Sequence, residues 1–246
     1  MFKILIIGES CLDVFQYGKC ERLSPELPVP VFVPVSKTEN PGMAGNVKNN
    51  LVALGAEAHL HTNFNWQSIS KTRFIEAKNN YMFIRIDEKD NEYGRSNLKS
   101  IDFSLYDAVI ISDYNKGFLT EAEIKYIATC HTLTFLDTKK SIGNWCKNIS
   151  FIKINNLEFQ KAKGNLSKDI IKKLIITLGP DGALHNGNIY PVQRVETRDV
   201  AGAGDAFISA LCVKYVETKK IEEAIKYANM CATQVVQHRG VTTVSI

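Results

Sequence analysis

The sequence predicts an α/β fold in which helices cover both faces of a mainly parallel sheet. Short apolar segments alternate with helical segments through the C-terminal two-thirds of the 246 residues, which is the pattern of such a sheet. Polar residues directly follow several of the strands, and ligands of these sheets bind at the carboxyl ends of the strands. The length fits one large domain, so we expect residues 1–246 to form a single domain.

The N-terminal part holds the less regular elements. Residues 3–7 are expected to form a buried strand that ends at Gly8. Residues 29–35 are expected to form a strand whose prolines place it at a sheet edge or outside the main sheet. The other expected elements here are a helix over 46–54, which stops at Gly55, and strands over 59–62 and 81–87.

The C-terminal part alternates regularly between the two element types. Apolar runs bounded by turn residues predict strands over 108–112, 134–137, 151–154 and 174–178. Helical periodicity predicts helices over 121–130, 157–162, 203–216 and 221–237. The polar clusters that follow strands are residues 8–13, 112–113, 137–139, 155–158 and 177–182. Five such clusters predict a ligand-binding rim along one edge of the sheet.

Composition excludes several classes of function. The net charge is only +4 and the lysines are scattered, so we expect no nucleic-acid partner. The apolar runs are far shorter than the roughly 20 residues of a membrane helix, and the N-terminus does not resemble a secretory signal. The six cysteines lack the close spacing of metal ligands, so we expect reduced thiols in a cytoplasmic protein.

The segment DVAGAGDAFISA, residues 199–210, is the most informative stretch. Its glycines lead into a helix, and the backbone N–H groups at such a start can bind an anion. Asp205 at this point could take a proton from an attacking hydroxyl, or it could simply cap the helix; residue chemistry alone leaves both open. The chain has neither the GxxxxGK[ST] phosphate loop nor the third glycine of the dinucleotide fingerprint, which disfavours a dinucleotide oxidoreductase.

The same segment resembles the second motif of the PfkB (ribokinase-like) carbohydrate kinases. Further segments resemble one branch, the D-glycero-β-D-manno-heptose-7-phosphate kinases: GESCLD (8–13), RLSPE (22–26), PVPV (28–31), PGMAGNV (41–47), SDYNKG (112–117), YANMCA (227–232) and GVTTVS (240–245). The resemblance implies a ribokinase-like three-layer fold with a small β lid, whose strands fall within about 14–35 and 81–97. It also implies transfer of a phosphoryl group from ATP, with Mg²⁺, to the anomeric hydroxyl of the sugar.

The resemblance assigns a role to each matching residue. Asp205 would be the general base, and the backbone of Gly202, Ala203 and Gly204 would form the anion hole. The residues implied for ATP are Asn155, Glu158, Thr177, Gly179, Gly182 and Asn229, with Glu158 also serving Mg²⁺ through water. The residues implied for the sugar are Asp13, Gly42 and Asn46. The candidate cations for the phosphate of the sugar are Arg22, Lys116 and Lys139.

The chain departs from the family pattern in its length. Residues 63–78 replace a longer strand-and-helix stretch, which alters one wall of the sugar pocket. Two alternatives therefore stay open: a kinase acting on another sugar or sugar phosphate, and a non-catalytic sugar or nucleotide binder. Intact Asp205, Asn155 and Glu158 argue against a binder. Lids of this family often pair between two subunits, so we also expect a homodimer formed through the lid.

Overall fold

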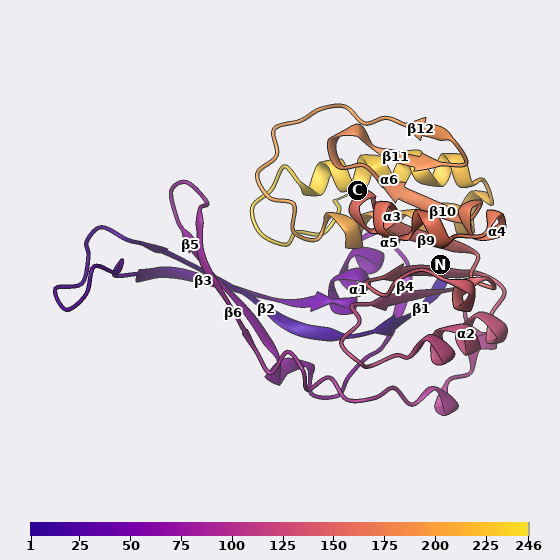
Figure 1. The fold of residues 1–246 in the computed structure, drawn as a ribbon, viewed down its shortest axis with the longest axis horizontal. Helices are drawn as coiled ribbons and strands as arrows, with labels where there is room; N and C mark the ends of the chain where they lie inside the picture. The colour runs from indigo at the N-terminus through magenta and orange to yellow at the C-terminus, as the bar shows by residue number, and fades with distance from the viewer. Residues whose placement is uncertain (246) are drawn as a thin grey trace.

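The computed structural model describes residues 1–245, which form a helix-covered large sheet and a smaller sheet that projects from one end of it (Figure 1). The large sheet has eight strands in the order β12-β11-β10-β9-β8-β7-β1-β4. Its strands are β1 (Lys3–Gly8), β4 (Glu57–His61), β7 (Ala108–Asp113), β8 (Thr134–Thr138), β9 (Phe151–Asn155), β10 (Leu174–Thr177), β11 (Ala183–His185) and β12 (Asn188–Tyr190). The six strands from β4 to β10 pair in parallel, as the alternating pattern predicts.

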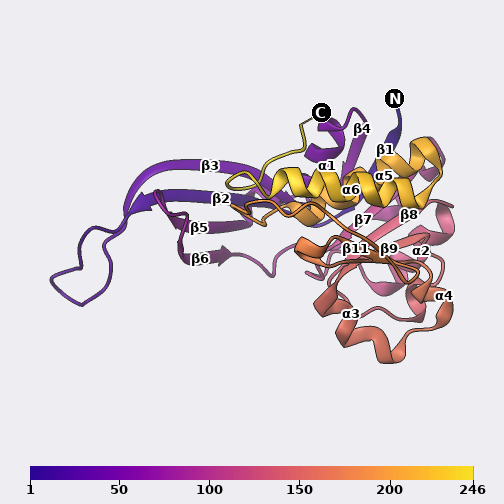
Figure 2. The same ribbon diagram turned by 90° about the horizontal axis from the view of Figure 1, so that it is seen from above.

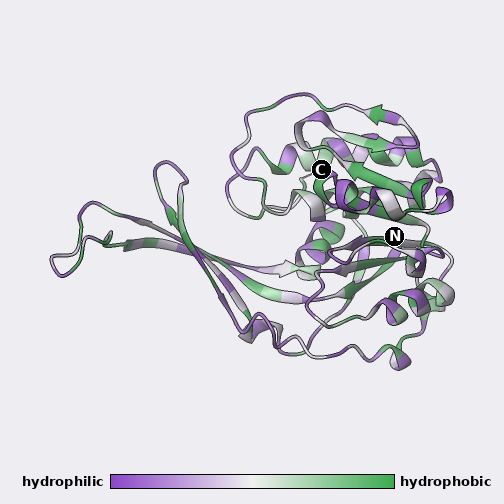
Figure 3. Cartoon of the chain, viewed as in Figure 1, coloured by the Kyte–Doolittle hydropathy of each residue, from purple (hydrophilic) through white to green (hydrophobic). Residues whose placement is uncertain are grey.

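Helices cover both faces of this sheet, and alternate strand residues form the two cores. Ile4 and Ile6 of β1 pack into one cluster, and Leu5 and Ile7 pack into the other, because successive side chains of a strand point to opposite faces. The first face is covered by α1 (Ala44–Ala53), α5 (Ala203–Thr218) and α6 (Ile221–Val235); the second by α2 (Glu121–Cys130), α3 (Asn156–Ala162) and α4 (Lys168–Ile171) (Figure 2). The central strands are accordingly among the most hydrophobic segments (Figure 3).

The smaller sheet is the expected lid, but its strands differ from the expected ones. It has the order β3-β2-β5-β6, with β2 (Ser10–Lys19), β3 (Val33–Met43), β5 (Ser70–Glu76) and β6 (Met82–Glu88). The strand expected over 29–35 is wrong at its start, because residues 20–32 form a loop with only one isolated bridge, Leu23 to Pro30. No separate strand was expected over β2, although its residues 14–19 lie within the expected lid range of 14–35. β5 lies outside both expected lid ranges, and nothing over 89–97 is a strand.

Smaller differences lie at the other end of the large sheet. The antiparallel pair β11 and β12 and the one-turn helix α4 were not expected, since elements of three or four residues leave almost no periodic signal. The remaining elements lie within two residues of their expected bounds. No helix within residues 1–245 has the length and apolar character needed to cross a membrane.

Candidate active site

Asp205 lies in the first turn of α5 as a buried carboxylate held by two hydrogen-bond donors. Asn46 Nδ2 on α1 donates to its Oδ2 at 2.7 Å, and the Tyr114 hydroxyl donates to its Oδ1 at 3.0 Å. Burial raises the pKa of Asp205 to about 6, against the opposing hydrogen bond from Asn46. Its side chain does not cap the helix, since the N-cap is Gly202. The carboxylate is therefore a base that is ionised at neutral pH and fixed in direction.

The glycines before Asp205 let the side chains of Asn46 and Lys153 come close to the backbone at the start of α5. Gly202 has a positive φ of 79°, and a Cβ placed there would lie 2.9 Å from Asn46 Nδ2. A Cβ on Gly204 would lie 2.8 Å from Nζ of Lys153. Lys153 is a buried lysine on β9, and its Nζ contacts Asp137 Oδ2 at 2.5 Å. An ammonium group thus lies directly beside the start of α5, where the helix dipole already favours an anion.

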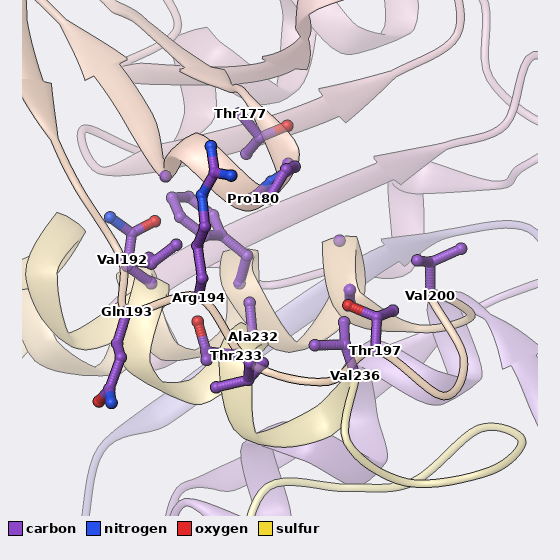
Figure 4. A pocket seen from close by; sticks show the side chains of 17 residues that line it. Thr177, Pro180, Val192, Gln193, Arg194, Thr197, Val200, Ala232, Thr233 and Val236 are labelled. Atoms are coloured by element: carbon purple, nitrogen blue, oxygen red, sulfur yellow. The ribbon is translucent and has the colours of Figure 1, made fainter.

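A cavity of about 360 Å³ lies beside these glycines and separates α6 from the turn after β10 (Figure 4). Ala203 and Gly204 line it together with four of the residues implied for ATP: Thr177, Gly179, Gly182 and Asn229. The remaining lining is largely apolar, with Val192, Val195, Val200, Ala232 and Val236 among its side chains. Asn229 joins α6 to the end of β12, because its Nδ2 donates to the carbonyl of Tyr190 at 2.7 Å. A mostly apolar cavity that ends at backbone N–H groups suits the base and phosphates of a nucleotide.

Asn155 and Glu158 lie outside that cavity and form the capping box of α3. The Asn155 side chain accepts from the Glu158 N–H at 2.8 Å, and Glu158 Oε2 accepts from the Asn155 N–H at 2.8 Å. Across β9 and β10, Asn155 pairs with Thr177 of the cavity wall. Glu158 Oε1 contacts Lys139 Nζ at 2.6 Å. Lys139, expected at the phosphate of the sugar, is therefore placed beside the residue expected to serve Mg²⁺.

These carboxylates fit a hydrated magnesium ion. Asp137 Oδ1 is buried and has no hydrogen-bond partner among the residues described. Burial acts against the charge of Lys139, but the neighbouring carboxylates of Asp137 and Glu158 raise its pKa. Mg²⁺ is commonly held by one or two carboxylates, waters and substrate phosphates. Within residues 1–245 no cluster of three or more acidic, histidine or cysteine side chains could hold a metal without such a substrate.

The residues expected to bind the sugar meet where the lid joins the large sheet. Asp13 on β2 and Gly42 on β3 lie so close that a Cβ on Gly42 would be 2.5 Å from Asp13 Oδ2. Asn46 lies one helical turn further on and bonds Asp205. Asp13 Oδ1 accepts from Nη1 of Arg73, a β5 residue, at 2.8 Å. Asp13, Gly42, Asn46 and Asp205 thus form a continuous line from the lid to the start of α5.

The structure places none of the three candidate cations on that line: Lys139 lies beside Glu158, and the other two lie elsewhere. Lys116 pairs with Asp90, which also pairs with Lys71 Nζ at 2.7 Å. Arg22 lies exposed in the loop between β2 and β3. This loop is at the far end of the lid, about 20 Å along β2 from Asp13 at 3.3 Å per residue (Figure 1).

Sequence reasoning missed Lys153, Lys71 and Arg73. A signal existed for Lys153, because a lysine inside the buried run Phe-Ile-Lys-Ile must find a counter-charge. Lys71 and Arg73 lie on β5, in a stretch where no strand was expected, so no pattern pointed to them.

The chain has relatives among known proteins. The chain matches the pfkB family carbohydrate kinases over residues 66–246. It is 31% identical to the bifunctional protein HldE of Helicobacter pylori over 301 positions, and 32% identical to that of Sulfurimonas denitrificans over 300. These alignments take in 100% and 99% of this chain but 65% and 62% of the relatives, so the chain spans less than two-thirds of their length. Since all 246 residues align over 301 positions, at least 55 positions of the first relative have no counterpart here.

Solved structures agree on the fold. A nucleoside kinase of Methanocaldococcus jannaschii, described as an archaeal member of the ribokinase family, superposes with a TM-score of 0.70 at 16% identity, over 100% of this chain and 95% of the other. A ribokinase of Thermotoga maritima also gives 0.70 at 16% identity, over 98% and 95%. The expected ribokinase-like fold is confirmed. The family match over residues 66–246 shows that this chain belongs to the pfkB family of carbohydrate kinases, which are phosphotransferases.

Proposed function

We propose that this protein transfers a phosphoryl group from ATP to a hydroxyl of a sugar phosphate. The proposed acceptor is D-glycero-β-D-manno-heptose 7-phosphate at its anomeric hydroxyl, which would give the 1,7-bisphosphate used in ADP-heptose synthesis. The observation that carries the proposal is the position of Asp205. Its buried carboxylate lies between the residues expected for the sugar, through Asn46, and the glycines that line the nucleotide cavity.

In the proposed step the sugar hydroxyl attacks the γ-phosphorus as its proton passes to a carboxylate oxygen of Asp205. A new P–O bond forms to the sugar, and the bond from the γ-phosphorus to the leaving oxygen of ADP breaks. The N–H groups at the start of α5 and the ammonium of Lys153 would face the charge on the transferring group. Phosphoryl transfer depends mostly on such positioning and charge stabilisation.

Glu158 and Asp137 would hold hydrated Mg²⁺, and Lys139 lies beside them as a further cation. When bound, the metal would neutralise charge on the ATP phosphates. Asp13 would accept hydrogen bonds from sugar hydroxyls, and Arg73 keeps its carboxylate oriented. Among the candidate cations, Lys116 is the one at the lid base, whereas Arg22 could reach a sugar only from another subunit.

The choice of sugar rests on the motifs over 8–47 and 112–117, which resemble heptose-7-phosphate kinases, and on the identity with the HldE proteins. A kinase for another sugar phosphate stays the second candidate, because the chain lacks at least 55 positions of a relative.

The test is phosphorus NMR of the protein with Mg-ATP and D-glycero-β-D-manno-heptose 7-phosphate, beside the Asp205→Asn variant. A new anomeric phosphate resonance that the variant does not produce would support both the acceptor and the base. Turnover only with another sugar phosphate would replace the acceptor and keep the kinase. ATP binding without turnover on any acceptor would favour a sugar- or nucleotide-binding protein, and failure to bind ATP would contradict the kinase proposal altogether.

We further propose that the lid pairs two subunits. β6 and β3 expose apolar side chains on the lid, including Met82, Ile84, Ile86, Val33 and Val35. Exposed apolar patches of this kind mark interaction surfaces on soluble proteins. Such pairing would also bring the loop of Arg22 near a second subunit.

A further inference from the structure

The large sheet has an open edge at β4. On one side β4 pairs in parallel with β1, and no strand of the described chain lies on its other side. From β4 the chain passes through the short turn Trp66–Ser68 directly into lid strand β5. No strand within residues 1–245 therefore pairs with this edge, although the segment 100–106 lies beside β4 and lines a hollow with it.

The backbone of β4 offers a regular set of unused hydrogen-bonding groups. The Glu57 N–H donates to the carbonyl of Phe2 at 2.9 Å, so Glu57 faces β1. In a parallel pair, alternate residues face the same neighbour. Ala58 and Leu60 therefore direct their N–H and C=O groups away from β1, and no described residue bonds them. Unpaired strand edges of this kind are templates for another strand.

The sequence of β4 is complementary to itself when read antiparallel. Centred on His59, the strand Glu-Ala-His-Leu-His places Ala58 opposite Leu60 of the partner subunit, and these are the residues whose backbone groups face outward. The same register places Glu57, whose Oε1 lies 2.9 Å from Nε2 of His59 in its own subunit, opposite His61 of the partner subunit, so a second imidazole meets this carboxylate. One register therefore matches the outward backbone groups, pairs Ala58 with Leu60, and pairs Glu57 with His61.

From this register we propose that two copies of the chain join edge to edge through β4, about a two-fold axis at His59. The contact is isologous, so each subunit uses the same residues. It would unite the two large sheets into one continuous sheet, with two hydrogen bonds between Ala58 and Leu60 of the partner subunit and two at the symmetric position.

The surroundings of β4 fit a covered interface. Phe64, just beyond the strand, is 95% exposed, and Val52 of α1 and Leu105 are also exposed. A hollow of about 560 Å³, lined by His59, His61 and Tyr106 among others, lies along the same strand. Large exposed apolar side chains on both sides of a free strand edge are unusual for a surface that stays in water.

The first test is a cysteine at the proposed axis. Residues opposite each other without hydrogen bonds in an antiparallel pair have Cα atoms about 4.5 Å apart, which is within the range of a disulfide. The His59→Cys variant should therefore form a covalent dimer under mild oxidation, with residue 59 linked to its own copy in peptide mass spectrometry. Val52→Cys, equally accessible but away from the axis, is the control and should link far less. Absence of the 59–59 link while the protein remains folded would overturn the proposal.

The second test removes one outward N–H group. Ala58→Pro takes away that donor without touching the pairing with β1, and Ala58→Val keeps it. Both variants also carry Ile84→Asp and Ile86→Asp, which are expected to prevent pairing through the lid, so that any dimer measured comes from β4. By sedimentation the proline variant should be monomeric and the valine variant dimeric, with circular dichroism confirming that both fold. A valine variant that is monomeric at about 50 μM, well above the Kd of a standard interface, would contradict the proposal.

The third test exchanges the polar pair. Glu57→His places two imidazoles opposite each other, and His61→Glu places two carboxylates opposite each other. Each single change should weaken dimerisation at least tenfold, and the double change should restore it. Equal Kd values for all four proteins would exclude this register. None of these residues lies at the proposed active site, so failure here leaves the proposed kinase activity untouched.

Discussion

Asp205 sets the expected dependence of activity on pH. Its pKa of about 6 reflects burial, and only the ionised form can accept a proton. We expect log kcat/KM to rise with unit slope below pH 6 and to level off above it. Tyr114→Phe removes a hydrogen bond that lowers this pKa, so it should move the rise to higher pH. The phosphates of the substrates also titrate near pH 6, but their pKa values are the same for both proteins. Identical profiles would show that the rise does not come from Asp205.

The same carboxylate should lower the stability of the fold. Its pKa is about 6 when folded against 3.8 as a free side chain, so the native state binds the proton more tightly. Stability from this group is present at low pH and is lost as the pH rises to about 6, by about 3 kcal/mol in total at 1.36 kcal/mol per pKa unit. Between pH 5 and pH 8, urea unfolding should show the part of this loss that falls in that range, about 1.4 kcal/mol, in the wild type and not in Asp205→Asn. A parallel response of both proteins would contradict the assignment.

Lys153 is expected to contribute to turnover although no motif includes it. Lys153→Met removes the ammonium beside Gly204 and leaves the Asp137 carboxylate without its counter-charge. We expect kcat to fall by about 10²-fold, the usual effect of removing one preorganised charged donor, with little change in the KM of the sugar. The control is Lys172→Met at an exposed lysine. Unchanged kcat in the first variant would assign Lys153 to the fold alone.

At the scale of elements, the turn from β10 to β11 packs closely against the segment after β12, beside the nucleotide cavity. Gly182 has a φ of 92°, and a Cβ there would lie 2.1 Å from the carbonyl oxygen of Tyr190. Gly187, in the next turn, has a similar φ of 80° but open space around it.

Both changes to alanine strain a backbone of positive φ, by about 1 to 3 kcal/mol each. Only Gly182→Ala forces the turn away from Tyr190. It should therefore lower the free energy of unfolding, measured in urea, by at least about 2 kcal/mol more than Gly187→Ala does. It should also raise the KM for ATP. Equal losses for the two variants would mean that the close approach is easily relieved.

The elements predictable from the sequence are those with a strong local pattern. β1, α5 and α6 bury many of their residues, so their sequences contain the apolar residues that predict a strand or a helix. The lid strands lack this pattern of apolar residues. Residues 33–39 of β3 are all exposed, so alternation was absent, and only pairing with β2 makes them a strand. In the site, motif residues were predictable, but Lys153 and Arg73 owe their positions to neighbouring strands that sequence spacing does not reveal.

At the scale of the whole molecule, pairing through the lid predicts a change in mass. Ile84→Asp together with Ile86→Asp places charges in the apolar surface of β6. We expect sedimentation to give a lower mass than that of the wild type, because a buried unpaired carboxylate costs several kcal/mol; the proposed pairing through β4 would keep this variant dimeric. Ile171→Asp, at an exposed isoleucine of α4 on the large sheet, is the matched control and should keep the wild-type mass. The same mass for all three proteins would exclude the lid as an interface.

β2 runs from the sugar side to the loop of Arg22 as one strand, about 33 Å long at 3.3 Å per residue, with one irregularity in its pairing with β3 between Tyr17 and Gly18. Asp13 therefore lies on a strand that the proposed lid pairing would hold in place, whereas the nucleotide cavity belongs to the large sheet. Dilution below the dissociation constant of the pair should therefore raise the KM of the sugar and leave that of ATP unchanged. In this way the abundance of the protein would itself regulate how well it captures its acceptor.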